Sequence, residues 1–270
     1  MARRLRGLIG GVIVSAAVLT AVCAPLLAPA SPDFQNIAQR LLPPGTAGHL
    51  LGTDDVGRDV LSRLIFGSRV SLIVGCLAVL VSGALGTVLG LIAGYYGGWL
   101  DGAIMRLVDV QLAIPSLVLA IAVVAVFGPG LVKVIVILGV TGWVLYGRIV
   151  RGDVLALRER EFIEAARAMG ARDGHVILRH VLRNVIASVI VVATLQVGAM
   201  IITAASLSFL GLGVPVTVPT WGGMATEGRN YLPTAWWIAF FPGLAIMVTV
   251  FGVNFLGDWL RDWLDPHLRV

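Results

Sequence analysis

The chain has 270 residues, of which 58% are hydrophobic and only 13% are charged, and its net charge is +5. Soluble domains carry roughly 25% charged residues, so the composition excludes an ordinary soluble protein. Several apolar runs exceed the roughly 20 residues that a helix needs to cross a bilayer. These runs are continuous, which excludes the alternating pattern of a β-barrel. The composition predicts an all-α integral membrane protein.

Three classes of function find no support in the residues. The basic residues lack the interleaved aromatic residues of a nucleic-acid-binding surface, and they suit cytoplasmic loops that set membrane orientation. Cys23 and Cys76 form no CxxC pair, and the four histidines lack zinc-ligand spacing. Ser206 and Ser208 have no histidine or carboxylate within reach in the sequence. We therefore predict no nucleic-acid partner, no metal site and no catalytic residue in this chain.

The first 30 residues allow two interpretations. A basic start, an apolar run from Gly7 to about Ala28 and the sequence Ala-Pro-Ala resemble a cleaved secretory signal. The run is longer than a usual signal core, which favours a retained first span. Both interpretations take residue 31 to the outside.

Five further spans are predicted, which gives a six-span helical bundle with both termini in the cytoplasm. The loop of about residues 148–183 then also lies in the cytoplasm, and it holds eight of the 20 basic residues. Each arginine would cost about 2.5–3.5 kcal/mol in hydrocarbon, so this loop must lie in water. The predicted further spans are approximately 70–96, 104–127, 131–149, 185–209 and 234–256.

The outer segment 31–69 begins with turn-forming residues and continues as a predicted interfacial helix. Thr53 or Asp54 would cap this helix near Asp55, and Arg58 and Arg63 would face away from its apolar stripe. The aspartates do not follow the spacing of a calcium loop. The stripe comprises Val56, Val60, Leu61, Leu64 and Ile65.

The sequence holds no energy source for transport. A Walker motif is impossible because the only lysine, Lys133, is followed by Val134. Asp109, three residues from Arg106, is a candidate proton relay, although a structural Asp near a helix end is the favoured interpretation. Pro115 removes a hydrogen bond to the carbonyl of Gln111, which predicts a bend and a polar spot in the third span.

The stretch EFIEAARAMGARDG (161–174) predicts a short amphipathic helix in the cytoplasmic loop. Phe162, Ala165 or Ala166, and Met169 form one apolar stripe, and Gly170 ends the helix. Asp173 is then placed to cap a second helix. A hairpin on lipid headgroups and a helix that docks in a groove of a cytoplasmic partner explain this pattern equally well.

Several motifs carry a resemblance to a known family. Glu164, Ala165, Ala166 and Gly170 resemble the EAA loop signature of the membrane subunits of bacterial binding-protein-dependent ABC importers. The stretches at 50–72, 89–109, 205–214 and 254–268 resemble the C-type permease of the dipeptide, oligopeptide and nickel group. The likeness covers residues 49–270, an ABC transporter permease domain. Residues 1–48, the N-terminal span and outer loop, are less diagnostic.

The resemblance implies the transmembrane domain of a type I importer in the bacterial inner membrane. It also implies a second homologous permease subunit, two ATP-binding subunits that hold ATP and Mg, and an extracytoplasmic solute-binding protein. No cofactor is expected in this chain. In that family the EAA loop is the coupling helix, which docks on an ATPase subunit. The matching residues here are Phe162, Glu164, Ala165, Ala166, Met169 and Gly170.

The expected cargo is a dipeptide or oligopeptide, with nickel, haem or another small ligand as alternatives. Two departures from the family pattern bear on this expectation. Arg183 replaces a proline, which predicts a second cytoplasmic helix continuous with the fifth span, and Ala204 replaces a glutamate. A self-sufficient ion-coupled carrier or channel is the alternative class, and a non-transporting scaffold ranks below it. Ser206, Phe209 and Trp221 are candidate gate residues beside Asp109, Gln111 and Pro115.

Overall fold

The computed structural model describes residues 2–264, and this part of the chain is helical without strands. Short 3-10 turns (Ile37–Gln39 and Arg229–Tyr231) and a π-helical segment (Ile177–Val181) connect the α-helices. The α-helices are α1 (Ala2–Val22), α2 (Ala24–Leu27), α3 (Val60–Tyr96), α4 (Gly98–Leu112), α5 (Ser116–Phe127), α6 (Leu131–Leu157), α7 (Glu161–Ala168), α8 (Asp173–Val176), α9 (Leu182–Phe209), α10 (Trp221–Gly228) and α11 (Trp237–Leu264).

The predicted all-α membrane bundle is confirmed. Within residues 2–264, five helices are long and apolar enough to cross a membrane, and α4 with α5 gives a sixth crossing if the pair is one span. That pair is bent by 89°. The bend predicted at Pro115 in the span of about 104–127 is therefore present, and its helices begin at Gly98, earlier than predicted. Pro115 explains the break, because it supplies no N–H to continue α4 and instead caps the start of α5.

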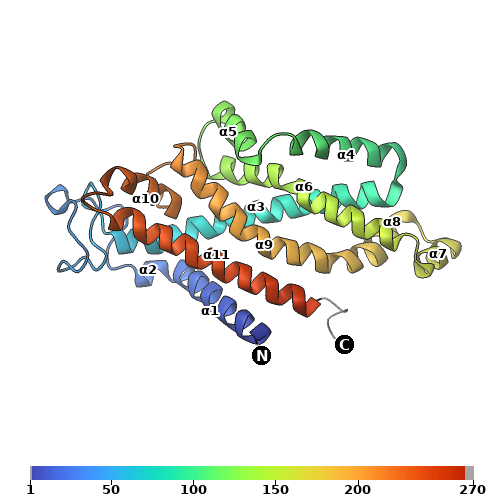
Figure 1. Ribbon diagram of the computed structural model, residues 1–270, viewed down its shortest axis with the longest axis horizontal. Helices are drawn as coiled ribbons and strands as arrows, with labels where there is room; N and C mark the ends of the chain where they lie inside the picture. The colour runs from blue at the N-terminus through green and yellow to red at the C-terminus, as the bar shows by residue number, and fades with distance from the viewer. Residues whose placement is uncertain (1, 265–270) are drawn as a thin grey trace.

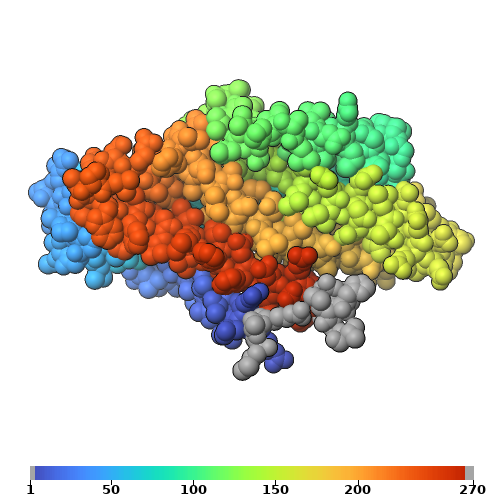
Figure 2. Space-filling model, in the orientation of Figure 1, coloured from blue at the N-terminus to red at the C-terminus, as the bar shows by residue number. Residues whose placement is uncertain are grey.

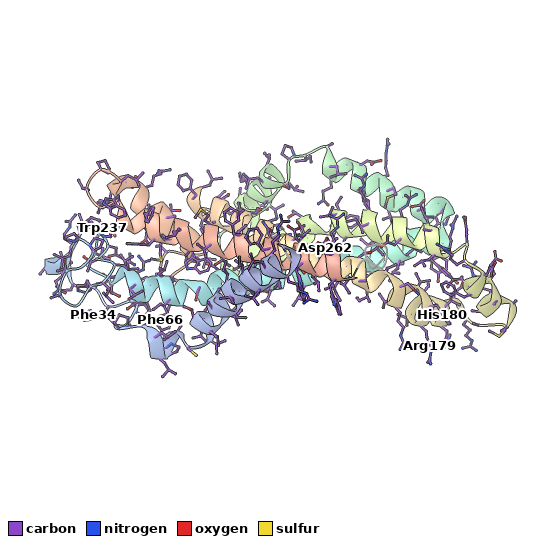
Figure 3. All side chains as sticks on the ribbon, turned by 60° about the horizontal axis from the view of Figure 1, so that its bottom comes forward. Phe34, Phe66, Arg179, His180, Trp237 and Asp262 are labelled. Carbon is purple, nitrogen blue, oxygen red and sulfur yellow. The ribbon has the colours of Figure 1, made fainter. Side chains whose placement is uncertain are left out.

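The bundle is elongated, and its two ends are different (Figure 1). α7 and α8 project from one end, whereas the segment 28–59 and α10 occupy the other. Figure 2 shows α4 and α5 along one edge and α1 with α11 along the opposite edge. The side chains labelled in Figure 3 mark the same two ends, with Arg179 and His180 far from Phe34 and Trp237.

Helices α3 and α6 form the centre of the bundle. Gly86, Gly90 and Gly94 lie four residues apart on one face of α3, which lets the two backbones approach closely. A Cβ atom at Gly90 would lie 2.7 Å from the carbonyl oxygen of Gly147, and one at Gly94 would lie 2.7 Å from Cβ of Val154. The glycine face therefore fixes the distance between α3 and α6.

The helices also extend beyond the predicted spans. α3 begins at Val60 rather than near residue 70, and α6 continues to Leu157 rather than ending near 149. At 1.5 Å per residue the 37 residues of α3 measure about 55 Å, well above the roughly 30 Å of hydrocarbon. A helix that leads into the second span was predicted for the outer segment, so the start of α3 before residue 70 agrees with that expectation. The extension of α6 was not predicted, because an apolar window does not detect its polar last turns.

Candidate functional site

The predicted cytoplasmic helix is present as α7, and its end has the geometry expected of Gly170. Gly170 has a φ of +83°, and its N–H donates to the carbonyl of Arg167 at 2.9 Å. The N–H of Ala171 donates to the carbonyl of Ala166 at 3.1 Å. This pair of bonds is a Schellman ending, which needs a residue that tolerates the left-handed conformation.

α7 has two apolar faces, of which one is buried against the bundle and the other is exposed. Ile163 is fully buried and Ala166 is 5% exposed, against residues from the ends of α3, α6 and α9. Phe162 is 44% exposed and Met169 is 82% exposed. Ala165 is exposed as well, so the predicted stripe runs through Ala165 and not through Ala166. Phe162, Ala165 and Met169 therefore form an apolar strip at the end of the bundle that residues 2–264 leave largely exposed, with the Phe162 ring 6.4 Å from that of His180.

A polar contact ties this loop to α3. The hydroxyl of Tyr95 donates to Oδ1 of Asp173 at 2.7 Å, and the guanidinium of Arg167 lies 4.9 Å from the centre of the Tyr95 ring. The prediction that Asp173 caps the second helix is wrong, because Arg172 occupies the N-cap and Asp173 begins α8. The carboxylate is engaged by Tyr95, a partner 78 residues away in sequence.

The second helix of this loop continues into the fifth predicted span. α8, the π-helical segment and α9 form one helix from Asp173 to Phe209. The predicted continuity through Arg183 is therefore confirmed. The π-helical turn at Ile177–Val181 was not predicted.

Two adjoining grooves run along the surface beside α6 and α9. One has a volume of about 380 Å³ and is bounded by the α4–α5 bend, and the other has a volume of about 650 Å³ and reaches the end of α11. Leu145 and Gln196 line both, so we treat them as one surface, the α6–α9 groove. Its other polar side chains are Gln111, Ser116, Thr141, Arg148, Asn184, Ser188, Thr203 and Arg261.

Gln111 fixes the position of the α4–α5 bend. Its Nε2 donates to the carbonyl of Thr141 at 2.5 Å, and its Oε1 accepts from Nε1 of Trp143 at 2.9 Å. Both partners belong to α6, so the last turn of α4 is bound to α6 just before the chain turns at Pro115. Gln111 and Pro115 line the α6–α9 groove.

The other candidate pathway residues do not line this groove. Asp109 is exposed on α4, and among the described residues it makes no ion pair with Arg106. The hydroxyl of Ser206 donates to the carbonyl of Ile202 at 2.9 Å on its own helix. The ring of Phe209 is 43% exposed and lies 5.1 Å from the Arg229 guanidinium.

Trp221 is a buried structural contact of α10. It is 3% exposed, and its Nε1 donates to the carbonyl of Leu64 at 3.0 Å. Its backbone N–H donates to Oγ of Ser71 at 3.2 Å. Trp221 thereby binds α10 to the first turns of α3.

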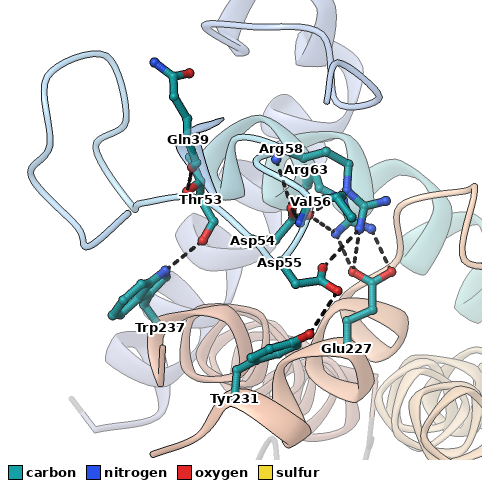
Figure 4. A network of polar contacts seen from close by, with 10 residues as sticks. All are labelled: Gln39, Thr53, Asp54, Asp55, Val56, Arg58, Arg63, Glu227, Tyr231 and Trp237. Carbon is teal, nitrogen blue, oxygen red and sulfur yellow. Dashed lines mark hydrogen bonds and ion pairs between the residues drawn. The ribbon is translucent and has the colours of Figure 1, made fainter. Parts of the chain in front are cut away.

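An ionic cluster at the α10 end was missed by the sequence reasoning (Figure 4). Arg63 is 2% exposed and donates to Asp54 at 2.7 Å and to Glu227 of α10 at 2.5 Å. Arg58 donates to the same two carboxylates at 2.6 Å and 3.0 Å. Glu227 lies 164 residues from Arg63, so no local pattern could have indicated the cluster.

The predicted helix start near Asp55 is therefore wrong. The helix begins at Val60, and Asp59 is its N-cap, with Oδ2 accepting from the N–H of Ser62 at 2.7 Å. Asp54 instead accepts from the backbone N–H groups of Val56 and Arg58 in the preceding turn. The stripe also differs from the prediction, because Arg63 faces the interior.

The same carboxylates are the only group among the described residues that could gather around a metal. Oxygen atoms of Asp54, Asp55 and Glu227 lie within 4.8 Å of one another. Asp54 and Glu227 already accept from Arg58 and Arg63. Their negative charge is compensated by arginine, which explains the cluster as an ion-pair network.

The comparisons with known proteins agree with this architecture. Residues 86–270 match the family described as "Binding-protein-dependent transport system inner membrane component", and residues 3–44 match the "N-terminal TM domain of oligopeptide transport permease C". A chain of the MetNI methionine ABC transporter, in an inward-facing structure, shares the fold with a TM-score of 0.60 at 20% identity. The similar region covers 75% of this chain and 96% of that one.

Curated relatives match most of the chain. The dipeptide transport system permease protein DppC of Alkalihalophilus pseudofirmus is 45% identical over 97% of this chain and 86% of its own length. The glutathione transport system permease protein GsiD of Pectobacterium atrosepticum is 47% identical over 83% and 74%. The di/tripeptide permease DppC of Pseudomonas aeruginosa is 42% identical over 98% and 89%. The chain thus belongs to the inner-membrane components of binding-protein-dependent transport systems, the multi-pass permease subunits of ABC importers.

Proposed function

We propose that this chain is one permease subunit of an ATP-driven importer of dipeptides and oligopeptides. The observation that carries the proposal is the uncovered apolar strip of α7, formed by Phe162, Ala165 and Met169, at the arginine-rich end of the bundle. The relatives support the cargo, because the names of three of them specify dipeptides, di/tripeptides and glutathione.

The α7 end faces the cytoplasm in this proposal. The segment 148–183, from the end of α6 through α7 and α8 to the start of α9, holds eight arginines, and such residues collect on the cytoplasmic side. The N-terminal end of α1 and the C-terminal end of α11 point toward the α7 end of the bundle (Figure 1). This direction supports a cytoplasmic location for both. The ionic cluster and α10 then face the outside, where a solute-binding protein delivers cargo.

The strip on α7 docks in a groove of an ATPase subunit. An amphipathic helix binds a partner by placing its apolar anchors in a groove, and the exposed anchors here are Phe162 and Met169. Glu164 lies beside them on the exposed surface, and Gly170 gives the loop its sharp turn. Ala166 acts from the other side, because it packs α7 onto the bundle. ATP and Mg bind to the partner subunits.

The α6–α9 groove forms half of the translocation pathway, and a second, homologous permease closes it. One feature argues that lipid does not fill it. The interrupted backbone at 113–115 borders the groove, and irregular backbone at membrane depth is tolerated beside protein or water. Amide and hydroxyl side chains suit a hydrated peptide backbone.

The experiment is to purify the complex with its partner chains and measure ATP hydrolysis in proteoliposomes. We expect binding protein loaded with a dipeptide or tripeptide to stimulate hydrolysis and drive peptide uptake. Stimulation by a nickel chelate or haem alone would keep the importer and reassign its cargo. Uptake by this chain alone, driven by an ion gradient, would overturn the proposal in favour of a self-sufficient carrier.

A further inference from the structure

α3 connects the two functional ends of the molecule. It runs unbroken from Val60 to Tyr96, and at 1.5 Å per residue it measures about 55 Å. It contacts α10 at one end and shares an apolar cluster with α7 at the other. α9, which is continuous with α8, also contacts α10, so α3 is one of two helices that join the two ends. A continuous helix transmits displacement along its axis better than a chain of loops does. A contact at one end of α3 can therefore affect the contacts at its other end.

The outer end of α3 is bound to α10 by charged and neutral contacts. Arg63 pairs with Glu227, and the indole of Trp221 donates to the carbonyl of Leu64. The N–H of Trp221 donates to Oγ of Ser71, about two turns further along α3 than Leu64. These bonds connect the first three turns of α3 to both ends of α10.

The inner end of α3 is bound to the cytoplasmic loop. Leu91 and Tyr95 pack with Ile163 and Ala166 of α7 in one apolar cluster. The hydroxyl of Tyr95 then reaches Asp173, the first residue of α8, at 2.7 Å. Arg167 of α7 covers the ring of the same tyrosine. Tyr95 is 6% exposed, and its ring and hydroxyl together contact both short helices.

Between its ends, α3 moves together with α6. The glycine face at Gly86, Gly90 and Gly94 brings the backbone of α3 against Gly147, Val150 and Val154 of α6. Interfaces packed so closely favour displacement as a unit over bending. A push on α7 is thus passed to α3 and α6 together.

We propose that α3 transmits the displacement of the ATPase-facing helix α7 to the outer helix α10, with Tyr95 as its positioning residue. The proposal rests on the proposed coupling role of α7. Tyr95 acts by keeping α7 and α8 in a fixed relation to α3, so that closure of the ATPase subunits displaces α10.

The experiment uses the complete complex in proteoliposomes with Tyr95→Phe, which removes only the hydroxyl. Cys23 and Cys76 are replaced by Ala, and Leu232→Cys supplies a single exposed outer thiol beside α10. The measurement is the change in thiol labelling rate on adding ATP with vanadate, divided by the rate of ATP hydrolysis. We expect the ratio to fall by roughly threefold to tenfold, the effect of one lost hydrogen bond.

Tyr96→Phe is the matched control, because Tyr96 is the next residue, is 51% exposed and has no hydrogen bond from its hydroxyl among the described residues. Asp173→Asn combined with Tyr95→Phe should lower the ratio no further than Tyr95→Phe alone. A ratio in Tyr95→Phe equal to that of Tyr96→Phe would overturn the proposal that Tyr95 positions α7 and α8 on α3. The proposal would also be overturned if the labelling rate of the outer thiol did not change on ATP binding in the complex without the Tyr95 substitution. Failure of ATPase subunits to bind the unmodified chain would instead refute the proposed coupling role.

Discussion

Arg63 and Asp54 form an ion pair of 2.7 Å in which both side chains are almost excluded from solvent, with exposed fractions of 3% and 0%. Glu227 of α10 forms a second ion pair with Arg63. Removing one partner of a buried pair leaves an uncompensated charge, whereas replacing the whole group by apolar residues can be neutral. The cluster therefore constrains which substitutions the outer end tolerates.

Arg63→Ala should lower the free energy of unfolding by about 1–3 kcal/mol, because Asp54 and Glu227 would lose their buried donor and keep Arg58 as their arginine partner. Thermal unfolding in detergent micelles measures the loss. Arg69→Ala is the control, since Arg69 is exposed on the same helix and makes no ion pair among the described residues. Equal stability of the two variants would contradict a structural role for the cluster.

Phe162→Ser with Met169→Ser should weaken binding of the ATPase subunits at least tenfold, because two apolar anchors of the α7 strip are lost. Membrane insertion and thermal stability should stay near those of the unmodified chain, since both side chains are exposed. Copurification with the ATPase subunits measures the effect. Ile163→Ser, on the buried face, is the contrast: we expect it to lower stability as well as binding.

The same loop illustrates how far the sequence could be interpreted. Helix periodicity and Gly170 predicted α7 and its end, because both signals are local. The choice between Ala165 and Ala166 depended on which face the bundle covers, and only the packing against Leu91 and Val150 decides this. Continuity of α8 with α9 followed from the absence of proline at Arg183, which is again a local property.

Contacts between distant residues account for what was missed. Pro115 predicted a bend, but its angle of 89° depends on how Gln111 is held by α6. Asp54 has the residue type of an N-cap, yet it is used by Arg63 and Glu227 instead of by a helix start. The partner of Tyr95 lies 78 residues away. Residues that are distant in the sequence leave no local pattern, so contacts between them could not be predicted from one sequence.

Gly90→Ala should lower the free energy of unfolding by about 1–3 kcal/mol, because its Cβ would lie 2.7 Å from the carbonyl oxygen of Gly147 and neither helix can yield without repacking. Thermal unfolding of the purified chain measures this change. Gly152→Ala is the control on α6, where an added Cβ meets nothing within 4 Å. That control should be neutral or slightly stabilising, since alanine favours a helix more than glycine does. A neutral Gly90→Ala would mean that α3 and α6 are less closely packed than described.

Gln111→Leu should loosen the α4–α5 bend, because the buried indole N–H of Trp143 would lose its acceptor and the bond from α4 to the carbonyl of Thr141 would be lost. An unsatisfied buried polar group costs about 1–3 kcal/mol, so we expect a lower unfolding temperature together with slower peptide uptake at unchanged binding of the ATPase subunits. Gln111→Glu tests the geometry, since it keeps the acceptor for Trp143 while losing the donor to Thr141, and should retain part of the stability.

Gln196→Leu is the comparison within the α6–α9 groove: it removes a lining amide whose side chain makes no hydrogen bond among the described residues. We expect that variant to slow uptake without lowering the unfolding temperature. If Gln111→Leu and Gln196→Leu instead had the same unfolding temperature, the hydrogen bonds of Gln111 to α6 would not stabilise the bend. Pro115 alone would then have to explain the bend.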